Sequence, residues 1–171
     1  MQALVKGMLD YARGAATPTG FVPVELDAVL TATRADLDRA IADTGATIDA
    51  RPLPCVTGDP VLLGQLMQNL IENGLKYRGE SAPHIAIMAE SDSESWIVSV
   101  ADNGVGIPAE DRERIFQPFT RLHRHSKTPG SGIGLATCRR IVDRHSGRIW
   151  VESNVGAGSV FRFSLPKHAS A

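Results

Sequence analysis

Apolar residues recur at the spacing of an amphipathic helix in several stretches, namely residues 2–13, 26–43, 60–77 and 131–145. The Asp59–Pro60 pair predicts the start of the third helix, because Asp caps free N–H groups and Pro suits the first turn. Gly45 predicts the end of the second helix. A shorter helix is expected at 110–115.

Shorter segments have the composition and alternation of β-strands, namely residues 21–24, 46–50, 54–57, 84–91, 95–102, 147–152 and 159–165. Polar turns at 92–94 and 156–158 predict hairpins. Because strands interleave with helices, we predict an α+β fold with helices on one face of a mixed sheet. Residues 120–130 are polar and without periodicity, so a loop is expected there.

Length and composition are those of one globular domain. Of the 171 residues, 43% are hydrophobic and 22% charged, which is enough for a sizeable core. A net charge of −1 creates no global basic field, so no nucleic-acid partner is expected. The chain shows no signal peptide and no apolar run of about 18 residues, so we expect no membrane contact and a cytoplasmic location. Cys55 and Cys138 lack metal-ligand spacing and are expected to be free thiols.

Two glycine-rich runs carry the strongest chemical signal, DNGVGIP at 102–108 and GSGIGL at 130–135. Glycines let the backbone approach a ligand closely, and the N–H groups of the helix that follows the second run attract anions. Asp102 ends an apolar strand, where its carboxylate could accept a hydrogen bond from an exocyclic amine such as adenine N6. The two runs therefore predict a phosphate-bearing ligand whose other end is read by Asp102. An ordinary Asp-Asn-Gly turn remains the alternative.

The helix predicted at 60–77 has a polar stripe beside its apolar face. Asn69, Asn73 and Lys76 share one sector at about 100° per residue. Asn is a poor helix former, so two asparagines in one stripe indicate a role other than contact with solvent. An amide oxygen is a hard ligand for Mg²⁺, and an ammonium group pairs with phosphate. A plain exposed polar face remains the alternative.

A basic cluster lies between the two glycine runs, formed by Arg121, His123, Arg124, His125 and Lys127. It fits either a solvated loop or a lid over a triphosphate. The second glycine run is GxGxG without a strand before it, and the chain has no Walker A pattern. These two absences disfavour the commonest nucleotide-binding folds.

In their order along the chain, these motifs resemble the ATP-binding catalytic domain of sensor histidine kinases, within the wider class of the Hsp90, DNA gyrase and MutL ATPases. NLIENGLKY (Asn69–Tyr77) resembles the N box, DNGVGIP the G1 box and IFQPFTRLH (Ile115–His123) the F box. GSGIGLATCRRIVDRHSGRIWVES (Gly130–Ser153) is similar to the G2 box, and GAGSVFRFSLP (Gly156–Pro166) to the closing glycine motif. The likeness covers about residues 21–166 and is closest in style to phytochrome-like light-sensor kinases.

The resemblance implies a fold and a set of site residues. The fold would be a Bergerat-type two-layer α/β sandwich, with a mixed, mostly antiparallel sheet of about five strands covered on one face by three helices. Asn73 would hold Mg²⁺, and Asp102 would bind adenine N6 of ATP. The expected catalytic residues are Asn69 and Lys76 near the phosphates and Arg121 as a lid cation. The other nucleotide-binding positions are Tyr77, Gly104, Gly106, Ile107, Gly130, Ser131, Gly132, Ile133, Gly134, Leu135 and Ser159.

One position separates hydrolysis from transfer. Related ATPases carry a Glu four residues before the metal Asn, where it activates water, and this chain has Asn69 there. An amide is no general base at neutral pH, so phosphoryl transfer to an external acceptor is favoured. Two smaller departures are Ser159 in place of the usual Thr and Gly74 in place of Ala. Gly74 should weaken its helix by up to about 1 kcal/mol.

The acceptor implied by the resemblance is a histidine on a two-helix dimerisation domain, usually followed by an acidic residue. None of the histidines of this chain, His84, His123, His125, His145 and His168, is followed by Asp or Glu. Residues 1–13 resemble the end of that domain's second helix. We therefore expect a fragment in which 1–20 are a stub and linker, 21–166 the catalytic domain and 167–171 a tail.

The expected partners are the phosphoacceptor histidine domain and a response regulator. Two alternatives remain open at this point. One is a serine kinase of the anti-sigma-factor type, which uses a similar pocket. The other is a nucleotide-binding interaction module without turnover.

Overall fold

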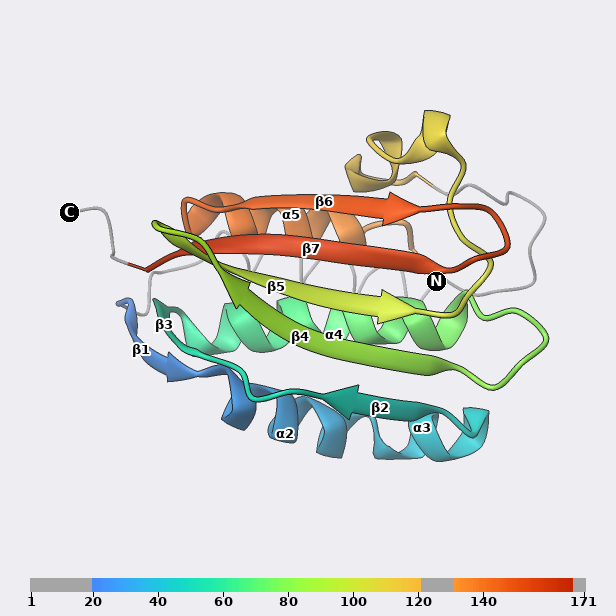
Figure 1. The fold of residues 1–171 in the computed structure, drawn as a ribbon, viewed down its shortest axis with the longest axis horizontal. Helices are drawn as coiled ribbons and strands as arrows, with labels where there is room; N and C mark the ends of the chain where they lie inside the picture. The colour runs from blue at the N-terminus through green and yellow to red at the C-terminus, as the bar shows by residue number, and fades with distance from the viewer. Residues whose placement is uncertain (1–19, 121–130, 168–171) are drawn as a thin grey trace.

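The computed structural model describes residues 20–120 and 131–167, which form helices, strands and two short 3-10 turns (Figure 1). In chain order these are β1 (Val22–Glu25), α2 (Leu26–Asp36), α3 (Asp38–Thr44), β2 (Thr47–Ala50), β3 (Cys55–Gly58), α4 (Pro60–Lys76), β4 (His84–Ser91), β5 (Ser95–Asp102), η1 (Ala109–Asp111), η2 (Arg114–Phe116), α5 (Gly134–Arg144), β6 (Arg148–Ser153) and β7 (Ser159–Pro166).

The main sheet has five strands in the order β2-β4-β5-β7-β6. Only β2 and β4 run parallel, and every other neighbouring pair is antiparallel. In Figure 1, α4 and α5 lie behind this sheet, and α2 packs beside α4 in the same helical layer. The predicted two-layer fold with a mixed, mostly antiparallel sheet is confirmed. A second, two-stranded sheet pairs β1 with β3 antiparallel.

The core forms where alternate strand positions meet the apolar sector of α4. The helix contributes five side chains that are almost completely buried, Leu63, Leu66, Met67, Leu70 and Ile71. The facing strand positions are Ile48, Ile85, Ile87, Val98, Val100, Phe161, Phe163 and Leu165. This is the apolar face that the helical periodicity indicates, and it fixes the rotation of α4 about its own axis.

Several predicted boundaries were wrong. The helix expected over 26–43 is interrupted at Leu37, whose φ of −99° and ψ of 4° end α2 and place its side chain in the core. The helix expected over 131–145 begins only at Gly134, because Gly132 has a φ of +70° that no helix accepts. The helix expected at 110–115 is instead the pair of turns η1 and η2.

Other predictions are confirmed. The hairpin strands β4 and β5 have the predicted bounds. Asp59 caps α4 by accepting hydrogen bonds from the N–H groups of Val61 (3.0 Å) and Leu62 (3.2 Å). Cys55 and Cys138 are free thiols. In the described part of the chain no helix is long and apolar enough to cross a membrane. The helix predicted at 2–13 and residues 121–130 of the loop predicted at 120–130 lie outside the described residues.

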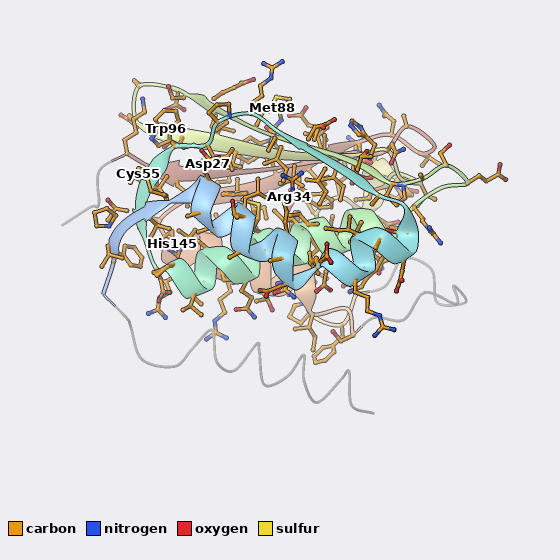
Figure 2. All side chains as sticks on the ribbon, turned by 90° about the horizontal axis from the view of Figure 1, so that it is seen from below. Asp27, Arg34, Cys55, Met88, Trp96 and His145 are labelled. Carbon is orange, nitrogen blue, oxygen red and sulfur yellow. The ribbon has the colours of Figure 1, made fainter. Side chains whose placement is uncertain are left out.

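His145 joins the end of α5 to the start of α4 and lies near the beginning of β1 (Figure 2). Its Nδ1 donates to the Ile141 carbonyl at 2.7 Å, and its Nε2 accepts from the Asp59 N–H at 3.0 Å. The Phe21 ring stacks on the imidazole, with centroids 4.6 Å apart. Since both nitrogens are engaged in the neutral form, protonating Nε2 would set an N–H against an N–H. Burial accordingly lowers the pKa of His145.

We expect the free energy of unfolding to depend on this histidine at mildly acidic pH. A folded-state pKa below the unfolded value of about 6.5 gives a contribution that is complete above that value. It is lost as the pH falls through 6.5 toward the lower folded value. Urea unfolding at pH 8 and pH 5.5 should therefore show a smaller pH-dependent loss for His145→Gln than for the unaltered chain. Equal losses in the two proteins would contradict the assignment.

Candidate nucleotide-binding site

Asp102 stands at the end of β5, where this strand meets β7 and α4. It lies opposite Ser159 in the sheet register. A Cβ added to Gly74 of α4 would come within 3.3 Å of the Asp102 Cβ and 3.0 Å of the Ile85 Cδ1. A methyl group at position 74 would therefore require Ile85 and Asp102 to move by a few tenths of an ångström.

The Asp102 carboxylate is largely removed from water. Desolvation raises its pKa, while the backbone N–H groups of Gly104 and Ser159 act in the opposite direction. The Gly104 N–H donates to Asp102 Oδ1 at 2.8 Å. Within the described residues no cation contributes to the pKa of this partly buried carboxylate. The carboxylate is therefore an acceptor suited to the N–H groups of a ligand.

The loop after Asp102 is held between α4 and the β6–β7 turn. The Val105 N–H donates to the Tyr77 carbonyl at 3.0 Å, and the Gly156 N–H donates to the Val105 carbonyl at 2.8 Å. A Cβ on Gly104 would lie 2.4 Å from the Tyr77 carbonyl oxygen, and one on Gly106 (φ +75°) would lie 2.0 Å from that of Asn154. Backbone occupies both places, so this loop requires the two glycines that the sequence indicates.

The polar stripe of α4 faces the start of α5. Asn69 Oδ1 lies 3.4 Å from the position of a Cβ on Gly134, and the Asn69 amide lies beside the buried Cys138 thiol. The Asn73 Nδ2 is buried and has no hydrogen-bond partner within residues 20–120 and 131–167. Buried amides are normally satisfied, so this one is positioned for a group that the described chain does not supply.

Lys76 differs from the two asparagines. Its ammonium pairs with the Glu72 carboxylate one turn earlier at 2.6 Å, and its side chain is 41% exposed. The sequence analysis did not predict this ion pair. Tyr77 is exposed at the end of the same helix.

The second glycine run leads into α5 without a side-chain cap. Ile133 is buried at the N-cap position and Leu135 packs against the core. The N–H groups of the first turn have no intrahelical partners, so they form an anion-attracting end beside Asn69. Gly132 accepts from the Phe119 N–H at 2.9 Å, which orients the approach to the helix. Ser131 is the residue before Gly132. Gly130 and Arg121 lie outside the described residues.

Sequence reasoning missed Ser153. Its buried hydroxyl accepts from the Ile107 N–H at 2.8 Å and donates to the Gly158 carbonyl at 2.7 Å. It also lies 2.9 Å from the Ser159 hydroxyl. The alternation Ile149, Val151, Ser153 along β6 was the available signal, because it turns a hydroxyl toward the core.

Three comparisons with known proteins agree with this geometry. Residues 58–169 match the family described as histidine kinase-, DNA gyrase B- and HSP90-like ATPases. This chain belongs to that family. The resemblance to the ATP-binding catalytic domain of sensor histidine kinases is confirmed, and with it ATP as the nucleotide.

The domain is similar in sequence to cyanobacterial phytochrome A of Nostoc sp. strain PCC 7120, with 43% identity over 97% of this chain and 22% of the relative. It is 38% identical to the adaptive-response sensory kinase SasA of Parasynechococcus marenigrum over 97% of this chain and 45% of that kinase. The chain therefore spans less than half the length of these relatives.

Solved structures give the same picture. The catalytic domain of histidine kinase ThkA matches with a TM-score of 0.75 and 28% identity, covering 89% of this chain and 100% of that one. Full-length ShkA in complex with AMPPNP matches with a TM-score of 0.82 and 27% identity over 98% of this chain and 36% of ShkA.

We expect Asp102→Asn to weaken ATP binding by about ten- to a hundredfold, because one hydrogen bond to a charged group contributes about 1.5–3 kcal/mol. Calorimetry with a non-hydrolysable ATP analogue measures the loss. Equal binding by the variant would contradict the assignment of Asp102.

The same variant should be more stable than the unaltered domain without nucleotide. A carboxyl whose folded pKa is raised contributes stability that is complete below its unfolded pKa of about 3.9 and is lost as the pH rises through the folded value. Thermal unfolding should therefore show a higher Tm for Asp102→Asn at pH 7.5, with the difference shrinking toward pH 4. A lower Tm at pH 7.5 would contradict this account.

Proposed function

We propose that this domain donates the γ-phosphate of ATP to a histidine on a dimerisation domain, for onward transfer to an aspartate of a response regulator. The observation that carries the proposal is Asn69, which lies beside the start of α5 where a hydrolysing ATPase would need a base. An amide cannot take a proton from water at neutral pH. The site is therefore better suited to positioning ATP for an external acceptor.

The groups of the site that lack partners support a particular orientation of the nucleotide, with the base at one end and the phosphates at the other. Asp102 receives the adenine amine, while the first turn of α5 and Asn69 lie at the phosphates. We assign Lys76 to the phosphates as well, which requires it to exchange its Glu72 partner for them. Arg121 is proposed as a further cation at the γ-phosphate.

Mg²⁺ fits the residues present. In the described part of the chain no three His, Cys, Asp or Glu side chains gather as a metal site, so a metal would be held by Asn73 together with the phosphates. The metal would take the Asn73 Oδ1, whereas the unpartnered Nδ2 is a donor that suits a phosphate oxygen beside it. The ion would supply neutralisation of phosphate charge, which with positioning is most of what phosphoryl transfer requires.

Neither histidine within the described residues is placed as an acceptor. His145 is buried with both ring nitrogens engaged, and the His84 ring lies 2.8 Å from the Asp49 carboxylate. We therefore propose that the acceptor belongs to a dimerisation domain outside residues 21–166, with 1–20 as the stub of its second helix and a linker, and 167–171 as a tail. A cytoplasmic location is part of the same proposal.

Incubation of the chain with radiolabelled ATP and Mg²⁺ tests the transfer. We expect no phosphate on the chain alone, and acid-labile phosphate on a separately produced dimerisation domain of the parent protein when both are mixed. Asn73→Ala should lower the initial rate at least about tenfold, because it removes the proposed metal ligand.

The other outcomes discriminate the alternatives. Acid-labile phosphate on this chain alone would contradict an external acceptor. Acid-stable phosphate on a separate serine-bearing protein would favour the anti-sigma-factor type of kinase. ATP binding without any transfer would favour a nucleotide-binding module.

A further inference from the structure

The hydroxyl of Ser153 connects three parts of the adenine end of the site. It contacts the Ile107 N–H of the glycine loop, the Gly158 carbonyl of the β6–β7 turn and the hydroxyl of Ser159. Ser153 and Ser159 are only 7% and 5% exposed. Because little water reaches these two hydroxyls, they form their hydrogen bonds with each other and with the neighbouring backbone.

The direction of each hydrogen bond follows from counting protons. A serine hydroxyl has one proton and two lone pairs. The Gly158 carbonyl only accepts, so it takes the Ser153 proton, and the Ile107 N–H only donates, so it occupies one Ser153 lone pair. The 2.9 Å contact between the hydroxyls then has Ser159 as its only available donor. Ser159 is left with lone pairs alone for any further partner.

The groups that impose this direction are fixed by the backbone. Gly158 has a φ of +79°, and a Cβ there would lie 2.0 Å from the Asp102 carbonyl oxygen. Arg112 holds the end of β6 through a hydrogen bond to the Ser153 carbonyl. The backbone that carries the Gly158 carbonyl is therefore packed closely against the end of β5.

Ser159 is also a neighbour of the Asp102 carboxylate. The two residues are directly paired between β7 and β5, so their side chains leave the same face of the sheet. The Ser159 backbone N–H acts on the carboxylate as well. An ionised carboxylate and a hydroxyl without a free proton together offer acceptors only.

We propose that Ser153 is a positioning residue that sets the nucleobase preference of the site. By receiving the proton of Ser159 it leaves only acceptors beside Asp102 at the C6 substituent of the base, where an exocyclic amine donates and a 6-oxo group meets them lone pair to lone pair. The inference rests on the proposed function, in which Asp102 receives adenine.

The test compares the affinities of ADP and of IDP, which carries a 6-oxo group, measured by calorimetry on the whole chain. We expect the unaltered chain to prefer ADP. In Ser153→Ala the Ser159 proton is released and can turn toward the base, so the ratio of ADP to IDP affinity should fall about three- to tenfold. In the Ser159→Ala background the Ser153→Ala change should leave this ratio unmoved, because Ser153 acts through Ser159.

A merely structural role for Ser153 gives a different result. A loosened pocket would weaken both nucleotides equally and leave the ratio unchanged, which would overturn the proposal. Ser164→Ala is the matched control, since this serine lies on the outer face of β7, where its hydroxyl accepts from the Arg148 N–H. It should change neither affinity.

Three further outcomes are decisive. If circular dichroism shows that Ser153→Ala does not fold, Ser159→Ala replaces it, because that variant keeps the bonds of Ser153 to Ile107 and Gly158. Ser159→Ala must then lower the ratio of ADP to IDP affinity. An unchanged ratio would overturn the proposal. An unaltered chain that binds neither nucleotide would reject the proposed function itself. An unaltered chain that prefers ADP, with a ratio insensitive to both serines, would reject only the role of Ser153.

Discussion

The rest of the structure depends on the fixed rotation of α4. Its apolar sector is buried against the sheet, and its first turn is held by Asp59 and His145. Just after its end, the Tyr77 carbonyl accepts from the Val105 N–H of the glycine loop. A polar stripe beside a buried face can be aimed only if the helix cannot rotate. These contacts at both ends therefore place Asn69 against the start of α5 and bring Gly74 against Asp102.

Asp102 is the residue at which stability and function oppose each other. Its carboxylate is desolvated, which raises its pKa, and the two backbone N–H groups beside it compensate only in part. An uncharged residue would be easier to bury at this place. A carboxylate there is understandable as a ligand group whose missing partner arrives with the nucleotide, since perturbed ionisable groups gather at functional sites.

Much of this arrangement could be predicted from local patterns. The hairpin of β4 and β5, the Asp59 cap and the apolar sector of α4 each follow from a signal within a few neighbouring residues. The glycines at 104 and 106 were recognisable by type and spacing, although the carbonyls that exclude a side chain there come from distant segments.

The features that sequence reasoning missed depend on tertiary contacts. The break at Leu37 serves the core, and the late start of α5 follows from the φ of Gly132. The pairing of β1 with β3 needed knowledge of how distant strands meet. The Lys76–Glu72 pair is local, but helical spacing also allowed Lys76 to reach a phosphate. Ser153 was indicated only by its place in the apolar alternation of β6, which does not show what its hydroxyl contacts.

The two ends of the site are built by opposite means. At the proposed adenine end, Gly104, Gly106 and Ser153 have their polar and steric requirements met within the fold, so its shape exists before a ligand arrives. At the proposed phosphate end, the Asn73 Nδ2 and the first turn of α5 are left without protein partners in the described chain. Preformed shape gives selectivity, because a wrong base meets groups that cannot adapt. Unsatisfied donors give affinity, because the phosphates of a nucleotide meet requirements that the fold leaves open. A division of this kind predicts that substitutions at the first end change which nucleotide binds, whereas those at the second change how tightly any nucleotide binds.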